Sequence, residues 1–280
     1  MSKIKIVTDS TLDISNETAD QLGIVIVPLS ITINGETYLD RVDIDPAEFI
    51  ENMSVANELP KSSQPPAGAF LEVYDQLGKE GYEVLSIHMT GKMSGTVRSA
   101  ESAAQMSETK VTVVDSQFIS KALSFQVKEA AEMAKQGKSV EEILERLQSV
   151  REHTKLYIMV DTLENLVKGG RIGKGKAFIG SLLNIKPIAS LEGAEYNPVT
   201  KVRSHSQVVK FMVKQFADDV KGKTIRGVGI AHAEAHELST KIKNSIIELT
   251  GYQDIEIDYT GPIVSTHTGP GAFALMYYYE

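Results

Sequence analysis

Strand-like and helix-like segments alternate along the first half of this 280-residue chain, with short links between them. Apolar strand patterns at 4–7, 84–87 and 111–114 are each followed by a helical pattern. When a helix joins two neighbouring strands of one sheet, the strands run parallel and the crossover is right-handed. The sequence therefore predicts an α/β fold with a mostly parallel sheet in its N-terminal part.

The second half of the chain differs in character after the apolar run at 156–160. A loop rich in glycine and lysine follows, then a hairpin-like pair at 186–203 and further strands at 225–231 and 255–258. We divide the chain into an N-terminal α/β domain (1–160) and a smaller C-terminal α/β domain (161–280). Small-molecule sites favour clefts between domains, so we expect the ligand between these two.

The charge balance and the cysteine count exclude several classes of function. The 37 acidic and 29 basic residues leave a net charge of −8, whereas nucleic-acid binding needs a basic footprint. The chain has no cysteine, which excludes disulfides, thiolate catalysis and Cys-ligated zinc. The N-terminus has no apolar signal-peptide core, and no run reaches the length of a membrane span. We expect a soluble, cytoplasmic protein with no nucleic-acid partner and no transmembrane segment.

The stretch 82–104 carries the first candidate site. An apolar strand ends at a turn around Gly91, and Ser94, Gly95 and Thr96 then open a helix whose next residues are mostly small. A serine at a helix start accepts hydrogen bonds from the N–H groups of the first turn. Helix N-termini at the carboxyl ends of sheet strands also favour anions. Ser94 is therefore either a plain helix cap or part of an anion site.

A phosphate-binding P-loop is nearly matched by residues 170–177, GRIGKGKA. However, Ala177 stands where the Mg²⁺-binding Ser or Thr belongs, and 162–168 has a helical rather than a strand pattern. A basic surface that meets an anionic headgroup or an acidic partner is the better interpretation, with a solvated loop as the alternative. The basic residues of this region are Lys168, Arg171, Lys174, Lys176, Lys186, Lys201 and Arg203.

Histidines suggest two further sites. His232 and His236 have the i, i+4 spacing of zinc-binding helices, but no third ligand is evident, so a surface or capping role is favoured. Residues 266–271 read as a rigid polar loop in which Thr and Gly-Pro-Gly position His267 as a donor. Ser94 and His267 also allow a hydrolase pair, although no G-x-S-x-G elbow surrounds Ser94 and no orienting carboxylate is identifiable.

Several short motifs together resemble the DegV family of bacterial fatty-acid-binding proteins, over essentially the whole chain. The matching motifs are TDST at 8–11, SSQP at 62–65, SGT at 94–96, KGGRI at 168–172, Arg203, and HTGPG at 267–271. The resemblance implies one DegV/EDD-like unit, with an N-terminal parallel-sheet α/β domain and a smaller C-terminal α/β domain. It also implies one fatty acid buried between the two domains.

The same resemblance implies a carrier rather than an enzyme. Some members of the family are the lipid-presenting subunit of bacterial fatty-acid kinase, whose separate ATP-dependent subunit phosphorylates the bound carboxylate to an acyl phosphate for phospholipid synthesis. The carboxylate would be held by Ser62, Ser94 and His267, with Ser63, Gly95, Thr96, Thr268 and Gly269 at the site rim. Arg171, Lys174 and Arg203 would contact the partner or the phosphate. The family often has Thr where this chain has Ser62, so a hydroxyl is kept and a methyl is lost.

This interpretation needs no catalytic residue, no metal and no cofactor besides the bound long-chain fatty acid. Its partners are that fatty acid and the catalytic subunit of the kinase, with transient membrane contact. Two other classes of function stay open. One is a small-molecule hydrolase or transferase that uses Ser94 and His267, and the other is a nucleotide-binding protein that uses the glycine-lysine loop.

Overall fold

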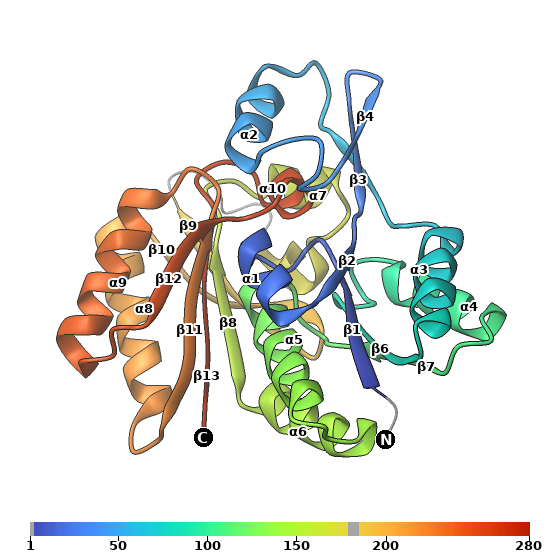
Figure 1. The fold of residues 1–280 in the computed structure, drawn as a ribbon. Helices are drawn as coiled ribbons and strands as arrows, with labels where there is room; N and C mark the ends of the chain where they lie inside the picture. The colour runs from blue at the N-terminus through green and yellow to red at the C-terminus, as the bar shows by residue number, and fades with distance from the viewer. Residues whose placement is uncertain (1–2, 179–184) are drawn as a thin grey trace.

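The computed structural model describes residues 3–178 and 185–280 (Figure 1). Its strands are β1 (Lys3–Asp9), β2 (Val25–Val27), β3 (Ser30–Ile33), β4 (Glu36–Leu39), β5 (Lys61–Ser63), β6 (Tyr82–His88), β7 (Val111–Asp115), β8 (Thr154–Met159), β9 (Lys186–Glu192), β10 (Glu195–Val202), β11 (Ile225–His232), β12 (Ile255–Tyr259) and β13 (Phe273–Tyr279). Its helices are α1 (Asn16–Leu22), α2 (Pro46–Val55), α3 (Ala67–Lys79), α4 (Thr96–Met106), α5 (Ser120–Lys135), α6 (Val140–Glu152), α7 (Glu164–Lys168), the 3₁₀ helix η1 (Gly173–Phe178), α8 (His205–Val220), α9 (His236–Thr250) and α10 (Pro262–Thr268).

A parallel sheet of strand order β2-β1-β6-β7 forms the N-terminal part, which confirms the prediction from the alternation of strands and helices. Helices α3 and α4 pack on one side of this sheet and α5 on the other (Figure 1). Because the strands are parallel, the loops that follow β1 and β6 emerge at the same edge of the sheet. Ligands of open α/β sheets bind at this edge.

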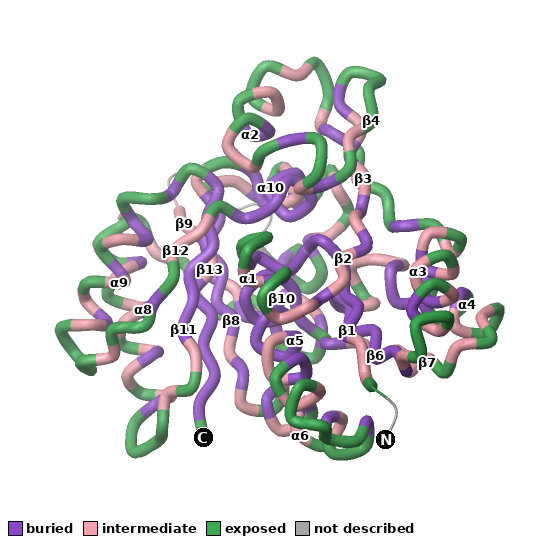
Figure 2. The backbone as a smooth tube through the Cα atoms, in the orientation of Figure 1, coloured by how far each residue is buried: buried purple, intermediate pink, exposed green. Residues whose placement is uncertain are grey.

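A second sheet has the order β10-β9-β8-β13-β11-β12 and is antiparallel except for the β11–β12 pair. Helix α5 lies between the two sheets, against β1 and β6 on one side and β8, β11 and β13 on the other. Helices α8 and α9 cover the far face of the second sheet (Figure 1). The chain is buried where these layers meet (Figure 2). Strand β8 belongs to the second sheet, so the chain passes from the first sheet to the second before residue 154. The domain division at residue 160 stays a prediction.

A small antiparallel sheet, β4-β3-β5, and α2 lie beside α10 at the carboxyl edge of the parallel sheet (Figure 1). The β3–β4 turn uses Asn34 and Gly35, whose φ angles are 49° and 89°. Positive φ at both central residues is the geometry of a type I′ hairpin, which the Asn-Gly pair favours. Phe49 and Ile50 of α2 share an apolar core with Ile263 of α10. This packing fixes the small sheet over the region where the polar loops end.

Two segments differ from the sequence-based expectation. The polar run KSSQPP at 61–66 is typical of a loop, but its Ser62 lies on β5, which pairs with β3. Residues 266–271 were expected to be a loop, but His267 lies on α10, which begins with Pro262 at its first turn. In α10 the Thr266 and Thr268 hydroxyls donate to the carbonyls four residues earlier, which satisfies side chains that otherwise favour loops. Tertiary pairing and core packing thus override weak local propensity in both segments.

Candidate functional site

Ser62 and His267 meet across 205 residues of sequence. The Ser62 Oγ atom lies 2.8 Å from Nε2 of His267, within hydrogen-bond distance. Strand β5 holds Ser62 through its pairing with Ile31 of β3, and α10 holds His267 one residue before its end. The structure therefore brings together two of the three residues expected to hold a carboxylate.

The imidazole of His267 is neutral at pH 7. Burial, and secondarily the nearby charge of Arg171, lower the pKa of His267 to about 4. Its Nδ1 atom is buried without a hydrogen-bond partner among the described residues, and lies against Gly169, where an added Cβ would come within 2.2 Å of it. An unpaired buried N–H is rarer than an unpaired acceptor, so we expect the proton on Nε2. Nε2–H then donates to Ser62, and the Ser62 hydroxyl is left to donate to a ligand.

Ser94 lies just before α4 and borders the same cavity as Ser62 and His267. Its Oγ atom is 2.8 Å from Thr96 Oγ1 and accepts from the Thr96 N–H at 3.3 Å. The N-cap position itself is Gly95, which provides no side-chain cap. A Cβ on Gly95 would come within 2.0 Å of Gln64 Oε1, so glycine lets Gln64 pack across the helix start. The first turn of α4 therefore keeps donors that favour an anion.

Arg171 also borders this cavity, although it was expected to contact a partner or a phosphate. Its Nε–H donates to the Met93 carbonyl at 3.1 Å and its Nη1–H to the Gly169 carbonyl at 2.6 Å. These bonds join the loop after β6 to the segment after α7. Lys174 and Arg203 are exposed and are not among the cavity-lining residues of the described chain, and Lys174 lies 3.7 Å from Glu195.

The cavity has a volume of about 320 Å³, with polar and apolar residues in its wall. Ser62, Ser94, Arg171 and His267 form the polar group, to which the structure adds Gln64, a residue not predicted from sequence. Ser63 and Thr268 also border the cavity, whereas Gly95, Thr96 and Gly269 are not among its lining residues in the described chain. The apolar wall is formed by Leu29, Met89, Met93, Ile119, Leu166, Ile263 and Val264. These side chains come from five separate segments, and no local sequence pattern marked them.

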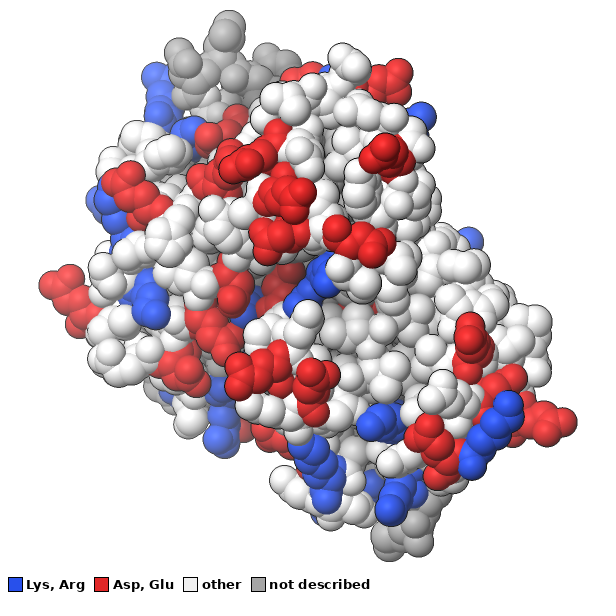
Figure 3. All heavy atoms as spheres, turned by 45° about the horizontal axis from the view of Figure 1, so that its top comes forward, with Lys and Arg blue, Asp and Glu red and all other residues white. Residues whose placement is uncertain are grey.

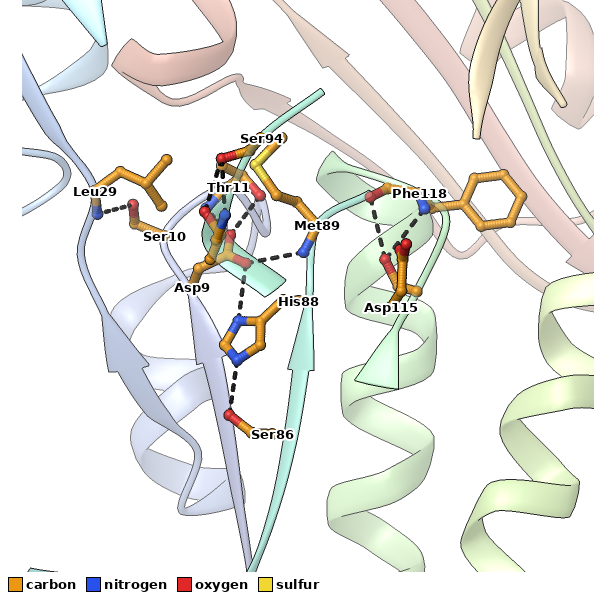
Figure 4. A network of polar contacts seen from close by, with 12 residues as sticks. Asp9, Ser10, Thr11, Leu29, Ser86, His88, Met89, Ser94, Asp115 and Phe118 are labelled. Atoms are coloured by element: carbon orange, nitrogen blue, oxygen red, sulfur yellow. Dashed lines mark hydrogen bonds and ion pairs between the residues drawn. The ribbon is translucent and has the colours of Figure 1, made fainter. Parts of the chain in front are cut away.

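A buried network below the site resembles a hydrolase triad. His88 joins Asp9 and Ser86, with Nδ1 3.1 Å from Asp9 Oδ2 and Nε2 2.7 Å from Ser86 Oγ (Figure 4). All three side chains are inaccessible to solvent, and none borders the cavity. A nucleophile must reach its substrate, so we assign this network a structural role in tying β1 to β6.

The other sequence-based alternatives have no matching geometry in the described residues. No hydrogen bond joins Ser94 to His267, which pairs with Ser62 instead. The glycine-lysine loop follows helix α7 and forms the 3₁₀ helix η1, whereas a P-loop follows a strand. The rings of His232 and His236 are 5.5 Å apart, and the described residues contain no group of three or more metal-ligating side chains.

The fold and the site define a class of protein: an α/β protein with two large sheets and a small one, and with a cavity of polar and apolar wall residues at the carboxyl edge of its parallel sheet. The family model described as "Uncharacterised protein, DegV family" matches residues 3–280. The chain belongs to the DegV family.

Relatives and solved structures agree with this assignment. A DegV domain-containing protein of Listeria monocytogenes is 45% identical over 279 residues, which cover 99% of each chain. A DegV family protein of Thermus thermophilus, whose structure is described as showing fatty acid binding, has a TM-score of 0.93 and 33% identity. The match covers 100% of both chains. DegV of Bacillus subtilis, described as a fatty acid binding protein, has a TM-score of 0.92 and 33% identity with the same coverage. These matches confirm the predicted family and its two-part α/β architecture.

Proposed function

We propose that this protein binds one long-chain fatty acid, with the carboxylate at Ser62, Ser94 and His267 and the chain along the apolar wall. The observation that carries the proposal is the mixed wall of the cavity, in which hydroxyl, imidazole and guanidinium groups border the same space as aliphatic side chains. Two solved relatives are described as fatty-acid-binding. A carboxylate with a long apolar chain matches both kinds of wall residue.

The energetics suit this ligand. Burial of about fourteen methylenes contributes about 11 kcal/mol, at about 0.8 kcal/mol for each CH₂. Association costs about 4–15 kcal/mol, so the chain must supply most of the affinity. A carboxylate is expensive to bury unless it is hydrogen-bonded. Hydroxyl donors and the charge of Arg171 stabilise the ionised headgroup, while the neutral His267 orients Ser62.

Replacing Ser94 and His267 together by Ala should remove the bound lipid. The variant loses the Ser94 contact with the headgroup and the His267 bond that orients Ser62. Affinity for a fatty acid is expected to fall by at least about 10- to 100-fold, since one hydrogen bond to a charged group contributes about 1.5–3 kcal/mol. The measurement is native mass spectrometry of the protein purified from a heterologous host, followed by extraction and identification of the lipid.

The matched control replaces the exposed Ser102 and His236 by Ala, and this variant should keep its lipid. A wild-type protein that arrives empty and refuses both palmitate and oleate would contradict the proposal. Turnover of an ester or phosphate by the isolated protein would favour the hydrolase alternative instead.

We further propose that the protein is a carrier that presents its ligand to a separate ATP-dependent kinase, which forms an acyl phosphate for phospholipid synthesis. The resemblance to lipid-presenting family members supports this step, and so does the position of Arg171 beside the headgroup, where it can also meet a phosphoryl group. Arg203 and Lys174 are assigned to the partner, because both are exposed.

Replacing Arg203 by Ala should leave the lipid content unchanged and slow acyl-phosphate formation by about 5- to 10-fold. A charge at the edge of an interface acts mainly on the rate of association. The measurement is acyl-phosphate production with the kinase subunit at limiting carrier concentration. Replacing Arg226, an exposed arginine paired with Glu280, is the control. Equal rates for wild type and the Arg203 variant would remove Arg203 from the partner contact.

Contact with a membrane, in this proposal, is brief. No helix of the described residues is long and apolar enough to cross a bilayer. Acidic side chains are spread over the face shown in Figure 3, and exposed acids of segment 34–58 contribute to the negative charge: Glu36, Asp43, Asp45, Glu48, Glu51 and Glu58. Anionic headgroups repel such a surface.

A further inference from the structure

A narrow space of about 20 Å³, which we call the continuation, adjoins the wide cavity. This continuation is lined by apolar side chains of β8 and β13 and by the start of α5. Four residues border both spaces: Ile119, Tyr196, Val264 and Thr268. The headgroup residues Ser62, Ser94, Arg171 and His267 border the wide part and not the continuation. Tyr196 therefore lies where the two spaces adjoin, next to a space that none of the four headgroup residues borders.

The side chain of Tyr196 faces this space. Tyr196 pairs with Leu191 across the β9–β10 ladder, and both belong to the apolar core that includes Ala122 and Leu123 of α5. The side chain is thus directed toward α5, where the continuation runs. Tyr196 is 4% exposed, so its hydroxyl lies in the protein interior rather than in bulk water.

The Tyr196 hydroxyl makes no hydrogen bond with a described residue. Burial raises the pKa of Tyr196, so the hydroxyl stays protonated and is a donor at neutral pH. A buried tyrosine hydroxyl normally finds a hydrogen-bond partner. Because Tyr196 borders the cavity, a molecule that fills the cavity can supply that partner.

The other hydroxyls of the continuation are already engaged. Thr260 donates to Asp13 Oδ2 at 2.9 Å, Ser120 donates to the same oxygen, and Thr268 donates to the Val264 carbonyl at 3.1 Å. His232 also borders the continuation, but its ring packs against His236 of α9 and Tyr259. That ring lies on the face of the second sheet turned away from α5. Tyr196 therefore carries the unpaired hydroxyl among the described residues of the continuation. The His232 Nδ1 atom is also buried without a hydrogen-bond partner among them, but its ring lies on the other face of the sheet.

We propose that Tyr196 makes this protein selective for acyl chains that carry an oxygen atom, as a hydroxyl or keto group, part-way along the chain. The inference rests on the proposed function and adds a substrate class to it. The chain oxygen accepts the Tyr196 O–H in apolar surroundings, where a hydrogen bond is strong. A saturated chain without such an oxygen leaves the Tyr196 hydroxyl unpaired, so it binds less tightly than an oxygenated chain.

The test is competition for the lipid-free protein between stearic acid and hydroxystearic acids, read by native mass spectrometry. The hydroxyl is placed at carbon 2, 6, 9, 12 or 18 in separate experiments. Wild type is expected to prefer one of the mid-chain positions over stearic acid by at least fivefold, with no such preference for carbon 2 or 18. Tyr196→Phe removes only the hydroxyl, and should abolish the preference while still binding stearic acid.

Tyr157→Phe is the matched control, because Tyr157 is a buried tyrosine whose ring packs with Phe211 of α8 on the far face of the same sheet. It should keep the wild-type preference. Binding of stearic acid without a preference at any position, or an unchanged preference in Tyr196→Phe, would overturn this inference alone. Failure to bind any of these acids would overturn the inference and the proposed function together. If Tyr196→Phe does not fold, the inference is still tested by whether the affinity of wild type depends on the position of the hydroxyl along the chain.

Discussion

Replacing Asp9 by Ala is expected to lower the free energy of unfolding by about 3–5 kcal/mol, the range found when one partner of a buried ionic contact is removed. Asp9 is fully buried at the end of β1. It accepts from the Thr11 N–H at 3.0 Å, the Met89 N–H at 2.9 Å and the His88 imidazole at 3.1 Å (Figure 4). The substitution leaves these donors buried without a partner. Denaturation by urea measures the loss.

The pH dependence of this effect has a definite sign. Burial by itself raises the pKa of the Asp9 carboxyl, but the hydrogen bond and charge of His88, with hydrogen bonds from Thr11 and Met89, hold that pKa below its usual value of 3.8. A carboxyl with a lowered pKa stabilises the fold above its unfolded pKa and loses that contribution as pH falls through the folded pKa. Wild type should therefore lose stability below about pH 4 in a way that the Asp9 variant does not.

The control for this prediction is Asp20→Ala, which removes an exposed carboxylate from α1 and should change stability by less than about 0.5 kcal/mol. A loss below 1 kcal/mol in the Asp9 variant would show that the network is not the structural tie we describe. The same variant should bind lipid less well, because Met89 leads into the loop that carries Met93 and Ser94.

Replacing Asp40 by Asn is expected to stabilise the protein at pH 8 by about 2–4 kcal/mol. Burial raises the pKa of Asp40 to about 7, although Ser10 donates to its Oδ2 at 2.6 Å and the Arg41 charge is nearby. Oδ1 has no hydrogen-bond partner among the described residues. At pH 8 the folded protein must therefore hold a poorly compensated buried charge. Asn keeps an oxygen for Ser10 and removes that charge.

The sign follows from linkage between protonation and folding. Because the folded pKa lies above the unfolded value of 3.8, the contribution of Asp40 is fully favourable below pH 4 and is lost progressively up to about pH 7. The loss is at most about 4 kcal/mol. Urea denaturation at pH 5 and pH 8 should show a larger gain for Asp40→Asn at pH 8. Asp20→Asn, the same change at an exposed site, should show none, and an equal gain at both pH values for Asp40→Asn would refute the explanation.

Much of the secondary structure follows from local chemistry and was predictable. Ser139 and Glu142 form both bonds of a capping box at the start of α6, and Asp45 caps α2 with Pro46 at its first turn. Gly23 ends α1 in the left-handed conformation. These signals act within a few residues, so the sequence pattern alone predicts the caps that the structure contains.

The site was predicted in composition but not in arrangement. Ser62, Ser94 and His267 do border one cavity, yet Ser62 lies on a strand and His267 on a helix, where loops were expected. The three-residue strand β5 exists because β3 offers a pairing edge, and its residues, Lys-Ser-Ser, have no apolar pattern. Gln64 lies in the SSQP motif but was not predicted as a site residue, and Met93 and Tyr196 had no sequence signal, since each reaches the cavity from a different segment.

The sequence by itself determined the alternation of strands and helices, the parallel sheet, the helix ends and the membership of a family. The tertiary structure alone decided that Ser62 bonds His267, that Arg171 borders the cavity and that the second sheet is mainly antiparallel. It also decided that Asp9 and Asp40, both buried, have pKa values shifted in opposite directions. The physical reason is range: caps and turns depend on neighbours in sequence, whereas burial, desolvation and a shared cavity depend on segments that meet only when the chain is folded.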